Sequence, residues 1–195
     1  HQCDRRQRQM CIRDRLKSLV EEPHYIEIER LAPFQARGTE VPVVLDLMVH
    51  DIDLILEMVN SPIQNISASG AKMMSETIDL AHAHIKFENG VVANLKSSRI
   101  ARNYIRKIRT YQKNLYSITD LMIPQTELYG LENNNKFSSD AKTQLINTQS
   151  GEKTLYYEKF IPRNNDALLE EINDFVRSIN FRSSPIVDGQ AGLNA

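Results

Sequence analysis

Two alternating runs joined by Asn89-Gly90 constrain the fold of this chain more than any other feature. In residues 78–100, IDLAHAHIKFENGVVANLKSSRI, apolar and polar residues alternate on both sides of the dipeptide. Asn-Gly supplies the positive φ angles of a type I′ turn, so the stretch predicts an antiparallel hairpin. The predicted inward positions of its first arm are Ala81, Ala83, Ile85 and Phe87, and the outward ones are His82, His84 and Lys86.

Further strands are predicted on both sides of this hairpin. Residues 25–30 alternate with period two, and residues 104–121 indicate a second hairpin that turns near Lys113-Asn114. Single strands are expected at 62–73, 125–131 and 153–160, and the polar stretch 132–144 is expected to be a mobile loop.

A helix is predicted between the first strand and the hairpins. Thr39 is its candidate cap, Pro42 falls in its first turn, and it is expected to run to about Asn60. Its apolar stripe comprises Leu45, Met48, Val49, Ile52, Ile55, Leu56 and Val59. A polar stripe at spacings of four, three and four runs beside it and comprises Asp46, His50, Asp53 and Glu57.

The polar stripe is open to three interpretations. In the first interpretation it is a solvated face with Asp–His pairs one turn apart. In the second, His50 is a general base whose imidazole is oriented by a carboxylate of the stripe. The third interpretation, a metal site of two aspartates and a histidine, lacks a companion ligand pattern elsewhere, and the pair His82 and His84 lacks a third ligand. We therefore expect no metal site.

The order of elements predicts an α+β fold. One strand, one helix and a series of antiparallel strands precede a last helix, which is expected from about Asp166 with Asn165 as its cap and an apolar stripe that includes Val176 and Ile179. The expected architecture is a large, open, mostly antiparallel sheet with helices on one face, over residues 16–187. Residues 188–195 are expected to begin a further helix.

Residues 1–15, HQCDRRQRQMCIRDR, do not fit this organisation. The run MCIRD is what ATG-TGT-ATA-AGA-GAC encodes, which matches an adapter end used in transposase-based sequencing libraries, so we interpret the segment as translated adapter. The alternative is a natural basic arm for nucleic acid. The segment holds both cysteines, Cys3 and Cys11, and without its five arginines and two aspartates the chain has 19 Lys+Arg against 23 Asp+Glu.

These counts narrow the functional classes. A net charge of −4 argues against a nucleic-acid binder, and a cysteine-free remainder has no disulfide framework and no cysteine metal site. No apolar run approaches the roughly 20 residues that cross a bilayer. We expect a cytoplasmic protein with no membrane or nucleic-acid partner.

Four motifs in order resemble the Gfo/Idh/MocA family of oxidoreductases. DLMVHDIDL at 46–54 resembles the family's D-x-x-x-H-x-x-D helix, and the preceding residues from Ile28 extend the match. The other three are AHAHIKFENGVVANLKSSR at 81–99, RKIRTYQKNLYSITD at 106–120 and PIVDGQAGLNA at 185–195. The resemblance covers residues 16–195 and, within the family, is strongest to members that dehydrogenate sugar nucleotides at the 3-position.

The resemblance implies a C-terminal domain that forms the substrate site and the subunit interface of an NAD- or NADP-dependent dehydrogenase. Asp46 and His50 would serve proton transfer while a hydride leaves a hydroxyl-bearing carbon of a sugar or sugar nucleotide. The open sheet would join the subunits of a homo-oligomer. Arg37 is a candidate substrate contact, and the alternative is that it pairs with Glu40. Arg30 is a weaker candidate, and the alternative is a salt bridge at the end of the strand. Asp53 is the third candidate, and the alternative is a solvated surface residue.

Two family features are missing. There is no G-x-G-x-x-G dinucleotide motif and no Glu-Lys-Pro motif, whose lysine would complete the catalytic set. Both would precede Leu16, so we expect a truncated enzyme whose Rossmann domain is missing, whose cofactor-binding residues are unknown, and which is inactive as this fragment. The alternative is a non-catalytic ligand-binding or assembly module built on the same sheet.

Overall fold

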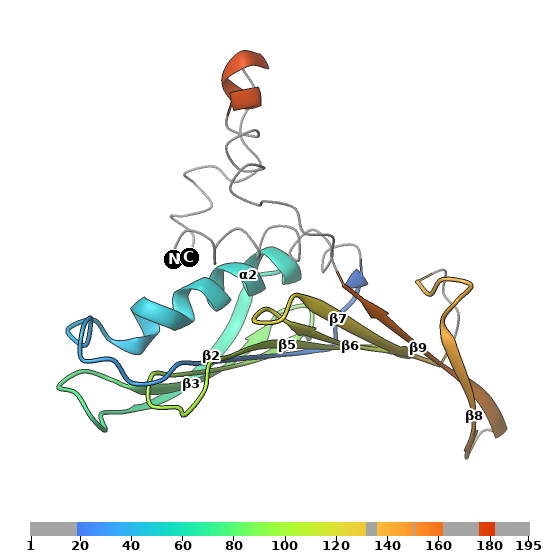
Figure 1. Cartoon of the computed structure of the whole chain (residues 1–195), viewed down its shortest axis with the longest axis horizontal. Helices are drawn as coiled ribbons and strands as arrows, with labels where there is room; N and C mark the ends of the chain where they lie inside the picture. Colours follow the sequence, from blue (N-terminus) through green and yellow to red (C-terminus); the bar gives the residue numbers. More distant parts are fainter. Residues whose placement is uncertain (1–18, 132–135, 150, 162–175, 182–195) are drawn as a thin grey trace.

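One curved sheet of nine strands organises the chain (Figure 1). The computed structural model describes residues 19–131, 136–149, 151–161 and 176–181. The spatial order of the strands is β2-β3-β4-β1-β5-β6-β7-β9-β8. All neighbouring strands are antiparallel except β1 and β4, which are parallel. The expected open, mostly antiparallel sheet is confirmed.

The strands follow the alternation of the sequence. β1 (Tyr25–Leu31) buries every second side chain, and β1 joins β4 on one side and β5 on the other. The remaining strands are β2 (Ile63–Ala71), β3 (Leu80–Phe87), β4 (Val92–Ser98), β5 (Ile105–Gln112), β6 (Leu115–Asp120), β7 (Gln125–Gly130), β8 (Lys142–Thr148) and β9 (Gly151–Phe160).

The β3–β4 hairpin forms where it was expected, but its turn differs. Gly90 has a φ of 88°, whereas Asn89 is not in the positive region. The Phe87 N–H donates to the Val91 carbonyl, which leaves three loop residues rather than two. The type I′ prediction is therefore wrong. The turn has the three-residue form with a left-handed glycine in last place, and the Asn89 side chain accepts a hydrogen bond from the Val91 N–H.

The predicted helix consists of two parts. A π-helical turn, η1 (Val44–Met48), leads into α2 (Val49–Val59), and the Val49 N–H bonds to the Val44 carbonyl five residues earlier. No side chain caps η1, and the Thr39 hydroxyl bonds to the Ala36 carbonyl instead, so the expected cap is wrong. The helix ends at Asn60, which adopts the left-handed conformation typical of a C-terminal cap.

The π turn changes which side of the helix is buried. Leu45, expected in the apolar stripe, is 65% exposed, and the buried residues of the two helical parts are Met48, Asp51, Leu54, Ile55 and Val59. A π turn holds more residues than an α turn, so residues before it are displaced around the axis relative to an α-helical pattern. Asp51, absent from the predicted stripe, shares its face of α2 with Leu54 and Ile55 and points at the sheet.

The predicted loop at 132–144 is confirmed at 136–141, where the chain forms neither helix nor strand, and is wrong at 142–144, where β8 begins. Phe137 is buried and its ring stacks near that of Tyr156, at 5.5 Å between centroids. β8 begins at Lys142 and pairs with β9. Its polar composition concealed it, because it is an edge strand whose side chains are mostly exposed.

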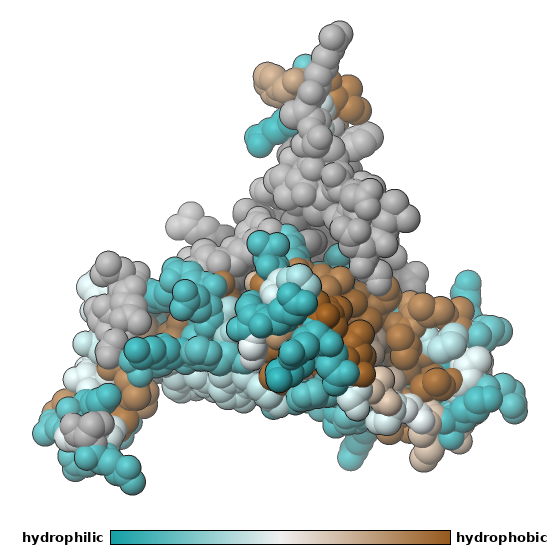
Figure 2. All heavy atoms as spheres, turned by 180° about the vertical axis from the view of Figure 1, so that it is seen from behind, coloured by the Kyte–Doolittle hydropathy of each residue, from teal (hydrophilic) through white to brown (hydrophobic). Residues whose placement is uncertain are grey.

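The layers place the helix on one face of the sheet only. In Figure 1, α2 lies across the sheet, and none of the described helices covers the opposite face, which we call the open face. Seen from behind, hydrophobic atoms gather on the helix side, whereas hydrophilic atoms dominate the tip at β8 and β9 (Figure 2). The core between sheet and helix includes Ile26, Ile28, Ile55, Leu95 and Ile108.

The C-terminal prediction is tested over only a few residues. Residues 176–181 are helical, and Val176 and Ile179 are 45% and 61% exposed. The rest of the expected helix, its Asn165 cap and the segment 188–195 lie outside the described residues. Within the described part, none of the helices is long and apolar enough to span a membrane.

Candidate catalytic helix and the open face of the sheet

Asp46 and His50 lie at the start of the helical segment. Asp46 belongs to η1 and is exposed, and His50 is the second residue of α2 and is half-buried. One continuous helical segment therefore carries a carboxylate and an imidazole four residues apart. Asp53, also half-buried, follows on the next turn. Turns of π-helix are rare and are frequently found at functional sites.

Arg30 does not lie beside these residues on the surface. Its guanidinium is 3% exposed and holds the Asp51 carboxylate with two bonds, Nε to Oδ2 at 2.8 Å and Nη2 to Oδ1 at 2.5 Å. Asp51 is 1% exposed. This pair fits the salt-bridge alternative for Arg30, because a side chain so fully enclosed between β1 and α2 has no face left for a substrate.

Arg37 is exposed on the loop between β1 and η1. Neighbouring Gly38 has a φ of 85°, so the chain turns sharply beside the guanidinium. Arg37 and Glu40 are both described and exposed, and no ion pair joins them. Arg37 thus remains a candidate substrate contact on the loop that leads into the helix.

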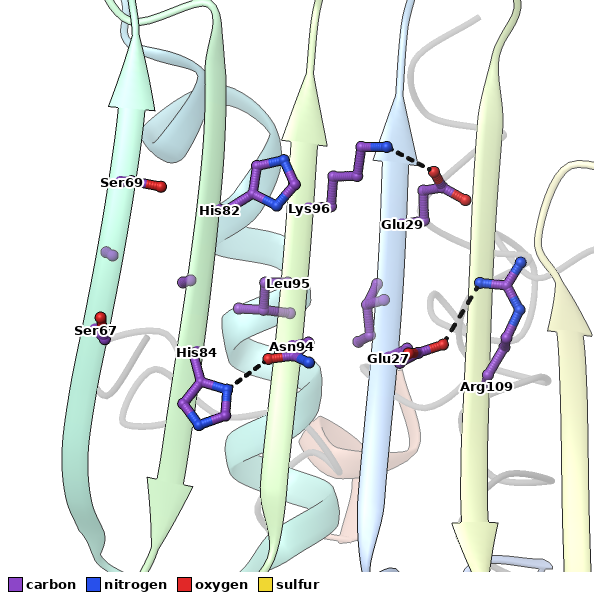
Figure 3. Close-up of a pocket in the computed structure, with 13 residues that line it drawn as sticks. Glu27, Glu29, Ser67, Ser69, His82, His84, Asn94, Leu95, Lys96 and Arg109 are labelled. Carbon is purple, nitrogen blue, oxygen red and sulfur yellow. Dashed lines mark hydrogen bonds and ion pairs between the residues drawn. The ribbon is translucent and has the colours of Figure 1, made fainter.

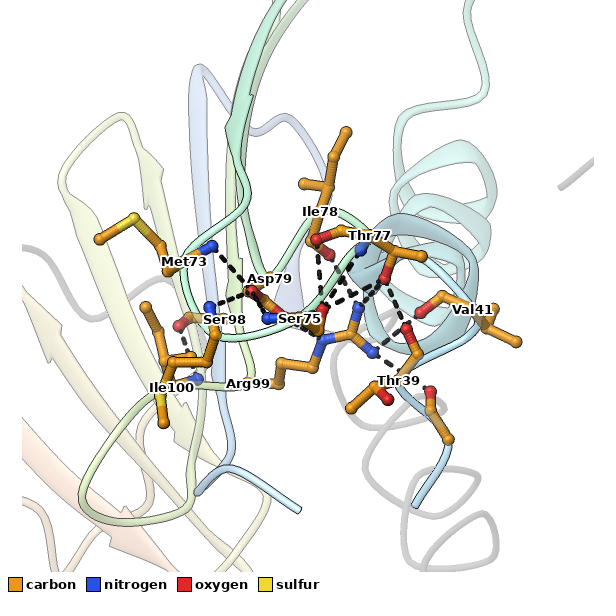
Figure 4. Close-up of polar contacts among 12 residues, drawn as sticks. Thr39, Val41, Met73, Ser75, Thr77, Ile78, Asp79, Ser98, Arg99 and Ile100 are labelled. Atoms are coloured by element: carbon orange, nitrogen blue, oxygen red, sulfur yellow. Dashed lines mark hydrogen bonds and ion pairs between the residues drawn. The ribbon is translucent and has the colours of Figure 1, made fainter. Parts of the chain in front are cut away.

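A buried hub holds that loop in place (Figure 4). The Arg99 guanidinium donates from all three nitrogens, and its acceptors are Asp79 Oδ1, the Thr77 hydroxyl, and the carbonyls of Gly38, Val41 and Ile78. The Thr77 hydroxyl also donates to the Thr39 carbonyl at 2.7 Å. The end of β4, the β2–β3 loop and the entry to η1 therefore meet at one arginine.

Asp79 is the anionic centre of this hub and is fully buried. Burial opposes its ionisation, but hydrogen bonds outweigh burial and hold the pKa of Asp79 well below its usual range. They come from the Ser75 hydroxyl and from the backbone N–H groups of Met73, Met74 and Ser75. The carboxylate is therefore charged at neutral pH and paired with Arg99.

The open face carries a polar groove of about 500 Å³ on the side of the sheet away from α2 (Figure 3). His82 and His84 project into it from β3, and His84 Nδ1 lies 2.7 Å from the Asn94 side-chain oxygen. Glu29 pairs with Lys96, and Glu27 pairs with Arg109. None of Asp46, His50, Asp53 and Arg37 lines this groove, so it is separate from the candidate catalytic helix.

A row of tyrosines crosses the same face in cross-strand register. Neighbouring ring centroids are 4.8–5.9 Å apart, and the members are Tyr25, Tyr111, Tyr116, Tyr129 and Tyr157. Burial is the largest cause that raises the pKa of Tyr111 to about 12, and the neighbouring Tyr116 and Glu27 add to it. Burial and the nearby Glu127 raise the pKa of Tyr129 to about 12. The neutral hydroxyls donate to Glu27 and Glu127, respectively.

The described residues contain neither a metal-binding cluster nor a glycine-rich dinucleotide motif. No group of three His, Cys, Asp or Glu side chains in this part of the chain is placed to hold a metal ion. The β1–η1 turn has a single glycine, and the sheet around it is mostly antiparallel, unlike the glycine-rich βαβ unit that cradles a dinucleotide. No residue here is therefore assigned to NAD or NADP.

Comparison with known proteins supplies the family. Residues 30–113 match the GFO/IDH/MocA C-terminal domain. A UDP-N-acetylglucosamine 3-dehydrogenase from Acidithiobacillus ferrooxidans is 31% identical over 170 residues, which are 87% of this chain and 50% of that protein. The chain belongs to the Gfo/Idh/MocA family. The resemblance inferred from the four motifs is confirmed.

Other family relatives agree. A myo-inositol 2-dehydrogenase from Thermotoga maritima is 22% identical over 78% of this chain and 43% of its own length. A solved structure of the A. ferrooxidans UDP-N-acetylglucosamine 3-dehydrogenase superposes with a TM-score of 0.77 at 28% identity and covers 95% of this chain and 56% of that one. The chain thus spans about half the length of the curated relatives it matches.

Three important residues were not singled out by sequence reasoning. They are Asp51, which pairs with Arg30, and Asp79 and Arg99, which pair with each other. Asp79 gave no local signal, because its carboxylate accepts from backbone N–H groups four to six residues earlier, at Met73, Met74 and Ser75. Asp51 gave no local signal either, because its burial follows from tertiary pairing with Arg30 on β1.

Proposed function

We propose that the complete protein is an NAD- or NADP-dependent dehydrogenase that oxidises a hydroxyl of a sugar or sugar nucleotide. In this proposal the domain described above presents the acid–base groups of the reaction. His50 accepts the proton of the substrate hydroxyl through its imidazole, and the Asp46 carboxylate orients the ring and stabilises the imidazolium. The observation that carries the proposal is that Asp46 and His50 belong to one helical segment that contains a π turn, Asp46 in η1 and His50 in α2.

The surroundings of these groups support this role. Arg37 stands exposed on the loop before the helix and offers a planar guanidinium fork, which suits phosphate or carboxylate oxygens. Asp53, one turn after His50, is the proposed contact for a second substrate hydroxyl. The relatives' activities on a sugar nucleotide and on an inositol favour a polyhydroxylated substrate.

The proposal is tested with the complete protein and His50→Gln. Sugar-dependent reduction of NAD and NADP is followed by absorbance with a panel of sugar nucleotides, free sugars and inositols. We expect reduction with at least one sugar substrate, and a fall in kcat of roughly 10²–10⁴-fold in His50→Gln, since that is the usual contribution of a general base. No reduction with any substrate would favour the non-catalytic binding or assembly module.

We also propose that two copies associate through the open face. Tyrosine and arginine are enriched at protein interfaces, and this face carries the tyrosine row beside charges of both signs. Four charged side chains lie in register on neighbouring strands, in the order Lys96, Glu29, Lys107 and Asp120. Because their signs alternate, a copy related by a two-fold axis can place unlike charges opposite one another.

A further inference from the structure

A buried ion pair, Arg30–Asp51, joins β1 to α2 and lies next to the candidate catalytic group. Asp51 directly follows His50 in α2, and Arg30 lies near the end of β1. Both side chains are almost fully enclosed. The other buried side chains of α2 are Leu54, Ile55 and Val59, which are all apolar.

Apolar packing and a bidentate ion pair constrain a helix differently. Hydrophobic contact is non-directional, so it keeps the helix on the sheet but tolerates small rotations about the helix axis and slides along it. Two parallel N–H···O bonds between a guanidinium and a carboxylate define one relative orientation. Because Asp51 is adjacent to His50, the orientation of the carboxylate also determines where the imidazole points.

The helical segment formed by η1 and α2 is also held at its N-terminal end. The Arg99 guanidinium binds the carbonyls of Gly38 at 3.2 Å and Val41 at 2.8 Å, just before η1. η1 itself has no side-chain cap, so its start depends on this external hold. Asp46 and His50 thus lie between two buried arginine contacts, one before the π turn and one after it.

We propose that Arg30 and Asp51 are positioning residues that set the axial rotation of the catalytic helix and hence the place of His50. This inference rests on the proposed function. Neither side chain touches substrate; both act through His50. The residue first considered as a substrate contact, Arg30, contributes to the reaction from inside the protein.

The test is the double variant Arg30→Met/Asp51→Leu in the complete enzyme. Replacing both members of a buried ion pair by apolar residues of similar volume usually preserves or raises stability, because no unpaired charge remains. The thermal midpoint is therefore expected to be kept. The directional contact is lost, so kcat should fall by roughly 10–100-fold, as a small displacement of a reacting group does, while the substrate KM changes less than kcat.

Two further variants make the result unambiguous. Arg30→Lys keeps the charge but not the two-bond fork, and it should fold and show an intermediate kcat. Glu21→Gln/Lys136→Gln removes a 3.2 Å ion pair away from the helix and should leave kcat unchanged. A double variant or an Arg30→Lys enzyme that is folded and has wild-type kcat would overturn the inference. If His50→Gln itself keeps full turnover, the proposed function has failed instead.

Discussion

At the scale of single residues, the described part of the fold contains four buried charged side chains, although charged residues are normally found at the surface. Arg99, Asp79, Arg30 and Asp51 are all less than 10% exposed. Removing one member of a buried pair leaves an uncompensated charge and costs several kcal/mol, whereas an exposed ion pair is worth little. An aspartate in an amphipathic helix is normally solvated, so the burial of Asp51 follows from tertiary packing and not from local pattern.

The Asp79 carboxylate makes a pH-dependent contribution to stability. Its pKa is depressed in the folded state, so its contribution is complete above the unfolded value of about 4 and is lost as the pH falls below it. We expect Asp79→Asn to lower the free energy of unfolding by roughly 3–5 kcal/mol at pH 7. Urea denaturation from pH 7 to pH 3 should show this difference shrinking with acid. An undiminished difference at pH 3 would contradict the assignment.

At the scale of elements, alternation predicted the strands well and their ends less well. The faces of β1 and β3 are as expected, since a half-buried strand must alternate with period two. The sequence pattern did not predict the three-residue form of the turn after β3 or the π turn before α2, because alternation and helical periodicity do not report the backbone angles of a turn. β8 was missed for a different reason: both of its faces are polar, so it has no alternation to detect.

The β3–β4 turn gives a direct prediction. A Cβ at Gly90 would meet no atom within 4 Å, so the cost of a side chain there is conformational and arises from the φ of 88°. We expect Gly90→Ala to lower the free energy of unfolding by about 1–2 kcal/mol. Gly90→Asn should cost less, because asparagine tolerates the left-handed region. Equal costs for the two variants in thermal unfolding would rule out this explanation.

At the scale of the whole molecule, four spaced motifs identified the family and the fold class, whereas geometry had to assign the roles of the charged residues. The order of the elements predicted a sheet with helices on one face, and the resemblance implied a catalytic role for Asp46 and His50. It did not separate Arg30, which is buried against α2, from Arg37, which is exposed. That distinction depends on the fold, since Arg30 lies on the helix-facing side of β1 and Arg37 lies on the loop after β1.

The proposed assembly is also a property of the whole molecule. Tyr116→Arg introduces a charge into the middle of the tyrosine row, and at a two-fold interface it would add two buried charges. We expect the oligomer to dissociate, as measured by light scattering after size-exclusion chromatography. Leu145→Arg is the matched control, since Leu145 is 66% exposed on the edge strand β8. An oligomer that survives Tyr116→Arg with unchanged mass would place the interface elsewhere.

The central claim, that His50 moves the substrate proton, is tested most directly by chemical rescue of the complete enzyme. His50→Ala removes the imidazole and leaves space for a small base. We expect its kcat to be at least about 100-fold below wild type and to rise with added imidazole in a saturable way, with no such rise in the wild-type enzyme. A folded His50→Ala enzyme with wild-type kcat, or one whose low kcat does not respond to imidazole or smaller amines, would contradict the claim.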